Sequence, residues 1–314
     1  LGAGHRARAA DYAVAAAERA SQALAFDRAA RLYEEAVALG DPALPTSAAL
    51  RGRLAEALTL AGRWADAAEH RLALAAEATG LEALALRQQA AEQLLCSGHF
   101  DRGAELLDGL LRSLGLFAPR SPLLILLSVV VVRMVLRVRG LVFRERAEAD
   151  VDPEDLARID VLSAAGYGLA MTDHVTSTYY MGRGALYALS VGEPQRVVRS
   201  LAMTAGIQAA QGYRGIEWTR TVVAATAAVG QRVNTAVSRG MVRQASAWLD
   251  YCCGNWTAGK VGLLEAEAIY RDECVGVTFL LNSVRALLYR ALAYRGDLRE
   301  LEVRLRPVLR EVEL

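Results

Sequence analysis

The stretch Gly62-Arg63-Trp64-Ala65-Asp66-Ala67-Ala68-Glu69-His70-Arg71-Leu72-Ala73-Leu74 decides the fold. A glycine stands two places before an aromatic residue. A small residue follows the aromatic at +3, a long side chain at +7 and an apolar one at +10. Glycine permits a tight turn between antiparallel helices, the small residue lets the helices approach closely, and the aromatic ring fills the gap between hairpins. The stretch therefore predicts a turn followed by the second helix of a helical hairpin.

The same frame occurs on either side of this stretch and again near the end of the sequence. Trp64 lies 38 residues after Phe26 and 36 before Phe100, so the spacing is that of a repeat. In the first copy Leu24 takes the place of the turn glycine, and a later copy at 192–201 keeps the frame only loosely. We expect the structural positions of the repeats to be Phe26, Ala29, Tyr33, Gly62, Trp64, Ala67, Gly98, Phe100, Gly254, Trp256 and Gly296.

The frame resembles the tetratricopeptide repeat, which has a period of about 34 residues, most closely over residues 10–112. The resemblance implies an all-α solenoid of antiparallel helix hairpins, wound as a right-handed superhelix, with a surface that binds other proteins. The composition agrees, because alanine and leucine dominate and only 7 prolines interrupt 314 residues, which favours helix. Each hairpin leaves an apolar face that only its neighbour covers, so we expect the hairpins to stack.

The net charge and the cysteine content indicate which classes of ligand and which cellular compartment to expect. With 36 basic and 35 acidic residues the net charge is +1, which does not favour nucleic acid as a ligand. The 4 cysteines form no C-x-x-C pair and no zinc-ligand spacing, as in proteins of a reducing cytoplasm. Lys260 is the sole lysine, a bias that indicates a bacterial genome of high GC content. We therefore expect a cytoplasmic bacterial protein.

Residues 119–147 break the repeat with two prolines, the apolar run Leu123–Val132 and the arginines Arg133, Arg137, Arg139, Arg144 and Arg146. We expect a joint here, between repeats in residues 1–118 and degenerate hairpins in residues 148–314. A helix over 123–136 spans about 21 Å, short of the roughly 30 Å of a bilayer core, so we do not expect it to cross a membrane. We favour a helix buried between the repeat blocks. The alternative is a peripheral membrane contact through residues 122–146.

Three strings resemble the C-terminal helical region of large bacterial serine/threonine kinases, in which an ATPase module precedes the repeats. They are Arg139-Gly140-Leu141-x-Phe143-Arg144-Glu145-Arg146, Asp152-Pro153-Glu154-x-Leu156-x-Arg158-Ile159-Asp160 and Gly192-Glu193-Pro194-x-Arg196-Val197. The resemblance implies a non-catalytic sensor or docking region of such a kinase or of a signal-transduction ATPase, with the catalytic domains N-terminal to Leu1. The alternative is a small-molecule (inducer) sensor domain of a bacterial signalling protein.

The sequence offers little that indicates catalysis or a bound cofactor. The segment from Gly254 to Lys260 has the glycine spacing of a phosphate loop, but it lacks the final Ser or Thr that binds magnesium. The repeat frame already accounts for its glycines. None of the 4 histidines is followed three or four residues later by another metal-ligand residue. We expect no enzyme activity in this chain, no cofactor and no metal.

In tetratricopeptide arrays the first helix of each hairpin lines the binding groove. Carried over by the frame, the positions six and three places before the turn are Glu18 and Ser21, Glu56 and Thr59, and Glu92 and Leu95. Adding the neighbouring glutamines gives the groove candidates Glu18, Gln22, Glu56, Thr59, Gln88 and Glu92. Carboxylates at equivalent places predict a protein or peptide partner that is basic or neutral. The alternative is that these glutamates are simply solvated residues of alanine-rich helices.

Overall fold

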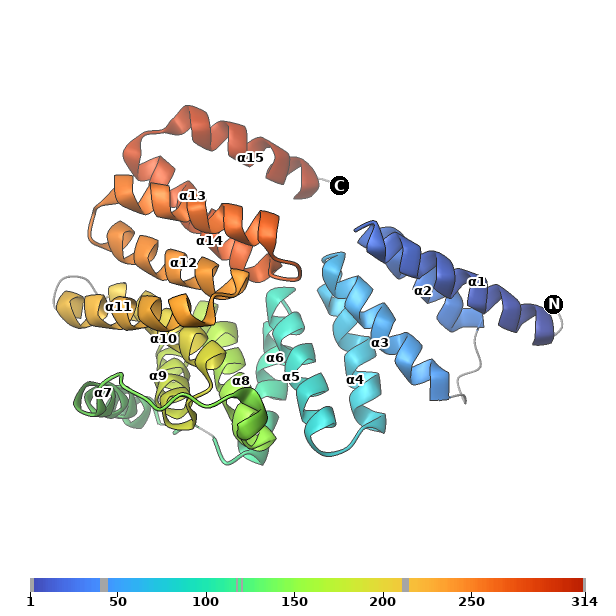
Figure 1. Ribbon diagram of the computed structural model, residues 1–314, viewed down its shortest axis with the longest axis horizontal. Coiled ribbons are helices and arrows are strands. Elements are labelled where there is room, and N and C mark those ends of the chain that lie inside the picture. Colours follow the sequence, from blue (N-terminus) through green and yellow to red (C-terminus); the bar gives the residue numbers. More distant parts are fainter. Residues whose placement is uncertain (1–2, 40–44, 117, 120, 211–214, 313–314) are drawn as a thin grey trace. The chain divides into compact units, whose positions relative to one another are not determined.

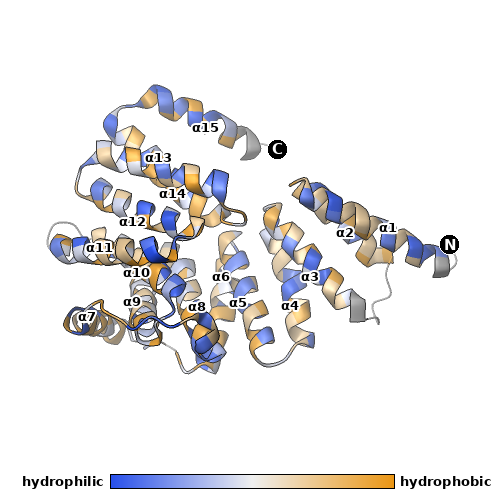
Figure 2. Ribbon diagram, viewed as in Figure 1, coloured by the Kyte–Doolittle hydropathy of each residue, from blue (hydrophilic) through white to orange (hydrophobic). Residues whose placement is uncertain are grey.

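The protein is an all-α helical solenoid, as the sequence predicts. The computed structural model describes residues 3–39, 45–116, 118–119, 121–210 and 215–312. These residues form fifteen α-helices and two short 3-10 helices, and they contain no strand (Figure 1). Figure 2 shows apolar and polar residues alternating along the ribbons, as expected for amphipathic helices that pack on one side.

The chain divides into two compact units. Unit 1 comprises residues 1–119 and 153–177, and unit 2 comprises residues 120–152 and 178–314. The apolar segment that we expected to be a joint is therefore part of unit 2, whereas residues 153–177 pack with the first repeats.

Unit 1 consists of three hairpins and one added helix. Successive helices contact one another along the chain, and the added helix α8 packs against α5 and α6. The helices are α1 (Ala3–Gln22), α2 (Phe26–Leu39), α3 (Pro45–Leu60), α4 (Trp64–Glu77), α5 (Gly80–Cys96), α6 (Phe100–Ser113) and α8 (Pro153–Gly168), followed by the 3-10 helix η2 (Leu169–Met171).

The core of unit 1 is built largely from alanine. Ala29 and Ala67 are fully buried where α2 and α4 meet their neighbours, and Tyr33 fills the space between the first two hairpins. Leu95 packs onto two glycines: a Cβ on Gly103 would lie 2.6 Å from its Cγ, and one on Gly168 would lie 2.2 Å from its Cδ1. This close packing joins α5 to both α6 and α8.

Unit 2 contains the remaining helices. The short 3-10 helix η1 (Glu148–Asp150) precedes the return to unit 1, and α9 begins in unit 1 and continues in unit 2. The α-helices are α7 (Pro122–Arg139), α9 (His174–Val191), α10 (Pro194–Ala209), α11 (Ile216–Val233), α12 (Ala236–Cys252), α13 (Trp256–Glu273), α14 (Thr278–Arg295) and α15 (Leu298–Val312).

A buried carboxylate ties the last three helices together. Glu267 on α13 is almost completely buried and accepts hydrogen bonds from Arg285 on α14 and Arg304 on α15, each at 2.9 Å. The two guanidinium groups offset the cost of burying this negative charge in the hairpin stack.

The turns at the frame positions share one geometry. At each, a residue with positive φ, between 58° and 86°, donates its N–H to the carbonyl three residues back. The next N–H reaches the carbonyl five residues back at 2.8–2.9 Å. This pair of bonds closes the last turn of the first helix. The positive-φ residues are Leu24, Gly62, Gly98, Gly254 and Gly296.

The loosely matching turn at Gly192 is different. Its φ is also positive, but a Cβ there would lie 2.1 Å from the carbonyl oxygen of Arg144. The N–H of Arg146 donates to the Gly192 carbonyl at 2.9 Å, so the segment after α7 runs directly over this turn. Glycine is required here by close approach as well as by backbone angle.

The expectation that the apolar helix is buried is wrong for most of its length. Only Ile125, Val129 and Leu136 of α7 are buried. Nine apolar side chains of the same helix are between 46% and 87% exposed: Leu123, Leu124, Leu126, Leu127, Val130, Val131, Met134, Val135 and Val138. The sequence did not indicate this, because apolar residues lie on all sides of the helix, and Ser128 and Arg133 alone between residues 123 and 136 do not define a polar face that would indicate solvent.

The turn geometry predicts opposite effects at two equivalent positions. Gly62→Ala should lower the free energy of unfolding by about 1 kcal/mol, because a Cβ disfavours the left-handed conformation. Leu24→Gly should raise the free energy of unfolding by about 0.5 kcal/mol. Glycine relieves the strain of the left-handed backbone conformation, and the leucine side chain that is lost is exposed. Urea denaturation measures both. As a control, Gly52→Ala within α3, where a Cβ meets no atom within 4 Å, should be stabilising; a stabilising Gly62→Ala would contradict the assigned turn.

Candidate partner-binding surface

The three predicted carboxylates lie on the first helices of successive hairpins in unit 1. Glu18 is on α1, where its carboxylate forms an ion pair with Arg53 of α3. Glu56 is exposed on α3. Glu92 is half-buried on α5 and accepts a hydrogen bond at 2.7 Å from Gln88, one turn earlier. Gln22 is exposed at the end of α1. The structure thus places all five side chains on first helices.

Thr59 lies between helices in a hydrogen-bond network. Its hydroxyl accepts bonds from the Arg71 guanidinium at 2.8 Å and from the Gln93 amide at 2.7 Å, and it donates to the Ala55 carbonyl at 2.6 Å. The indole of Trp64 donates to the Thr59 carbonyl at 3.0 Å. Thr59 therefore connects α3, α4 and α5.

Arg71 is the residue of this surface that sequence reasoning missed. It belongs to α4, and its Nε donates to Gln89 of α5 at 2.9 Å. Burial lowers the pKa of the guanidinium, while the charges of Glu56 and Glu92 act in the opposite direction. The surface therefore combines two carboxylates with one half-buried cation. The repeat frame could have indicated that Arg71 lies between helices. It occupies the +7 position, and the residues at this position in two other repeats, Tyr33 and Leu107, are both buried.

Leu95, which the frame placed in the groove, does not reach it. Its side chain is 5% exposed and packs on Gly103 and Gly168. The physical reason is α8, which covers α5 and α6 in unit 1, so this side of the third hairpin is an internal contact.

Cys96 lies one turn after Glu92 on α5. Burial raises the pKa of its thiol to about 12, and the negative charge of Glu92 adds to the effect. The thiol is therefore protonated at neutral pH and a poor nucleophile.

Trp256, the frame aromatic of unit 2, belongs to an aromatic cluster. Trp256 stacks on Tyr294 with ring centroids 5.5 Å apart, Tyr251 lies 6.2 Å from the same ring, and Trp248 lies 6.4 Å from Tyr251. These contacts join α12, α13 and α14. Phe100 and Trp256 are each about two-fifths exposed, so the frame aromatics cover the hairpin ends and are not fully inside them.

The segment with phosphate-loop spacing is a helix–turn–helix connection. Gly254 follows α12, and Lys260 lies within α13. The Lys260 ammonium donates to Asp297 at 2.9 Å and to Glu300 at 2.6 Å, which raises its pKa. The lysine thus links α13 to α15 through two carboxylates.

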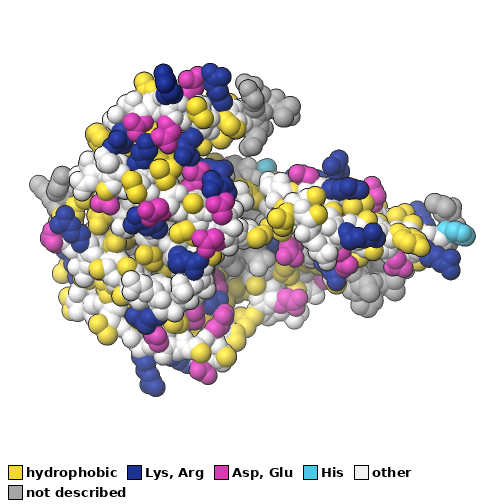
Figure 3. All heavy atoms as spheres, turned by 45° about the horizontal axis from the view of Figure 1, so that its top comes forward, with side chains coloured by type: hydrophobic (Ala, Val, Ile, Leu, Met, Phe, Trp, Pro, Cys, Tyr) yellow, Lys and Arg dark blue, Asp and Glu magenta, His cyan; other side chains and the backbone are white. Residues whose placement is uncertain are grey.

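Over the visible face of the molecule, basic and acidic side chains are interspersed (Figure 3). Within the described ranges there is no group of three or more His, Cys, Asp or Glu that could hold a metal ion. None of the described helices has the length and apolar character needed to cross a membrane.

Comparison with protein-family models gives no match, and neither does comparison with curated proteins. The class of protein therefore rests on the geometry: stacked helical hairpins define an all-α helical-repeat protein.

Removing the Thr59 hydroxyl should destabilise unit 1. Thr59→Val keeps the shape but leaves the donors of Arg71 and Gln93 without their acceptor, at a cost of about 2 kcal/mol in the free energy of unfolding. Thr221→Val is the matched control, because its exposed hydroxyl bonds only to the Glu217 carbonyl of its own helix. Equal losses in the two variants, measured by urea denaturation, would contradict the network.

The position of Glu92 beside Cys96 can be tested by alkylation. Glu92→Gln removes a negative charge that disfavours the thiolate, so the pKa of Cys96 should fall and its alkylation at mildly alkaline pH should be roughly two- to fivefold faster. Peptide mass spectrometry follows Cys96 alone. Glu105→Gln on α6 is the control, with no change expected. An unchanged rate in Glu92→Gln would show that the two groups are not close.

Proposed function

We propose that this chain is a non-catalytic interaction module that binds a protein or peptide on the surface formed by α1, α3 and α5. The observation that supports this most is the arrangement around Arg71. Glu56 and Glu92 belong to successive repeats, yet both act on one guanidinium, which the Thr59 network holds in place. Such a surface offers carboxylates in fixed positions, as a specific docking site requires.

The charge of this surface favours a basic or neutral partner. Arg71 donates to Thr59 and Gln89, so its hydrogen-bonding capacity is largely used within the unit. Glu56 is exposed and presents acceptors to solvent. A peptide that contributes Lys, Arg or backbone N–H donors complements such acceptors, whereas an acidic peptide meets like charge.

The biological setting that we propose is bacterial signalling in the cytoplasm. The resemblance of residues 139–160 and 192–197 to the helical tails of large serine/threonine kinases supports a role as the C-terminal docking or regulatory region of a kinase or signal-transduction ATPase. A small-molecule sensor is less well supported. One pocket in unit 2, lined by α7, α10 and α11, has a volume of about 240 Å³ and is open to solvent, below the roughly 300–1,000 Å³ of ligand sites. A second, of about 520 Å³, is also open and is lined by four residues of the single helix α15: Glu302, Val303, Arg306 and Pro307. Neither is the enclosed apolar pocket that a sensor of this kind needs.

The experiment is affinity capture from a high-GC bacterial lysate with the whole chain, read by quantitative mass spectrometry. The test variant is Glu56→Gln/Glu92→Gln, in which an amide replaces each carboxylate without loss of size. We expect a specific partner whose recovery falls roughly tenfold or more in this variant.

The matched control is Glu35→Gln/Glu105→Gln, which removes two exposed carboxylates from the second helices α2 and α6. Its net charge equals that of the test variant, so recovery should stay at the wild-type level. Equal recovery with all three proteins would show that the surface is wrongly placed. Recovery of no specific partner by the wild-type chain would contradict the proposed function itself.

A further inference from the structure

Helix α7 presents a continuous apolar face to solvent. Its nine exposed apolar residues, from Leu123 to Val138, occupy roughly half of the helix circumference at 3.6 residues per turn. The opposite side is buried through Ile125, Val129 and Leu136. Val132 lies against Gly182 of α9, where a Cβ would be only 2.6 Å from its Cγ1. The helix is therefore attached by one face, and the residues that the structure describes leave its other face exposed.

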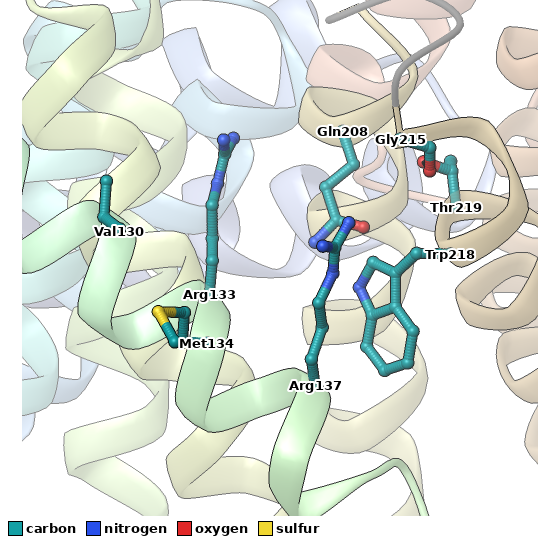
Figure 4. A pocket seen from close by; sticks show the side chains of 8 residues that line it. All are labelled: Val130, Arg133, Met134, Arg137, Gln208, Gly215, Trp218 and Thr219. Carbon is teal, nitrogen blue, oxygen red and sulfur yellow. Dashed lines mark hydrogen bonds between the residues drawn. The ribbon is translucent and has the colours of Figure 1, made fainter.

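Two arginines border this face and enter a pocket between α7, α10 and α11. Arg133 and Arg137 line it together with Gln208, Trp218 and neighbouring residues. In Figure 4 both arginine side chains extend from α7 in the same direction. The Arg137 guanidinium lies 5.9 Å from the Trp218 ring centroid. No carboxylate forms an ion pair with either arginine in the described part of the chain.

The environment of these arginines favours a negatively charged ligand in the pocket. Arg133 is half-buried, and its pKa is lowered first by burial and then by the charge of Arg137. Gln208 is 8% exposed, and its Oε1 has no hydrogen-bond partner in the described part of the chain. An amide that turns over would direct its N–H groups into the pocket. Two guanidinium groups and an amide match a phosphate oxygen cluster.

A second copy of this chain does not fit the face equally well. Helix α7 contains no Asp or Glu, so two copies packed through their apolar faces would supply no carboxylate for Arg133 and Arg137. A phospholipid surface offers both requirements at once, with acyl chains for the apolar side chains and phosphate for the arginines. Arg139 differs, because its guanidinium is bonded to the carbonyls of Gly140, Val142 and Leu189.

We propose that α7 lies in the interface of a membrane containing anionic phospholipid, with its apolar face among the acyl chains and a headgroup phosphate between Arg133 and Arg137. The helix lies along the surface and does not span it. This binding is separate from the partner surface on α1, α3 and α5, so either can fail without the other.

The test is co-sedimentation of the whole chain with vesicles of phosphatidylcholine alone and of phosphatidylcholine mixed with phosphatidylserine. The wild-type chain should bind the mixed vesicles. Leu127→Ser/Val131→Ser/Val138→Ser should reduce binding roughly tenfold or more. The matched control is Val275→Ser/Val303→Ser/Leu309→Ser, which changes one leucine and two valines of similar exposure outside α7 and should bind like the wild type.

The arginines are tested separately. Arg133→Gln/Arg137→Gln should lose roughly tenfold or more of the affinity that phosphatidylserine adds, whereas Arg290→Gln/Arg299→Gln, at exposed positions of α14 and α15, should keep it. Circular dichroism checks that every variant folds.

Three results would overturn the proposal. The first is absence of wild-type binding to the mixed vesicles. The second is equal loss in the α7 serine variant and its control. The third is a concentration-dependent dimer, seen by light scattering, that the α7 serine variant abolishes, because a second copy then covers the face. If the first result is accompanied by inorganic phosphate that binds the wild type and the α7 serine variant alike, the pocket is assigned to a free anion instead.

Discussion

The hairpins of this protein depend on one backbone constraint: the first helix ends at a residue with left-handed angles, and two hydrogen bonds close its last turn. The bond that spans five residues reverses the chain within two residues. The second helix is thereby brought against the first, and the position three places after its aromatic faces the first helix's backbone. There a Cβ on Gly259 would lie 3.1 Å from the Tyr251 nitrogen, and one on Gly103 would lie 3.2 Å from the Ala91 oxygen. The small residue of the frame is therefore a consequence of the turn.

Close helices built from small residues bury little apolar area per residue, and this increases the importance of polar contacts between them. A buried methyl group contributes about 0.8 kcal/mol, close to the roughly 1 kcal/mol of one hydrogen bond. In unit 1 the Thr59 hydroxyl joins three helices, and in unit 2 the Glu267 carboxylate does the same. Each network fixes the relative rotation of neighbouring helices, which alanine contacts alone specify weakly.

The repeat frame predicted correctly where the turns lie, but it did not predict what surrounds several of the side chains. The turn at Leu24 followed from spacing alone, since the left-handed residue must stand two places before the aromatic whatever its side chain. The environment of Arg71 could not be predicted, because its compensating charges come from two other helices. Leu95 was misplaced because α8, far along the sequence, covers its helix. The exposed face of α7 could not be predicted from periodicity, because apolar residues lie on all sides of the helix and only Ser128 and Arg133 interrupt them between residues 123 and 136.

Arg71 and Arg133 show how the same side chain can serve two purposes. Burial lowers the pKa of both, and a desolvated guanidinium is stable only when anionic or polar groups compensate it. For Arg71 the compensation is internal, from Glu56, Glu92 and the Thr59 hydroxyl, and the result is a rigid surface. For Arg133 the charge that acts on its pKa is that of another cation, Arg137. Within the described residues no carboxylate compensates it, and in our proposal the phosphate of a lipid headgroup does so beside the exposed apolar face of α7.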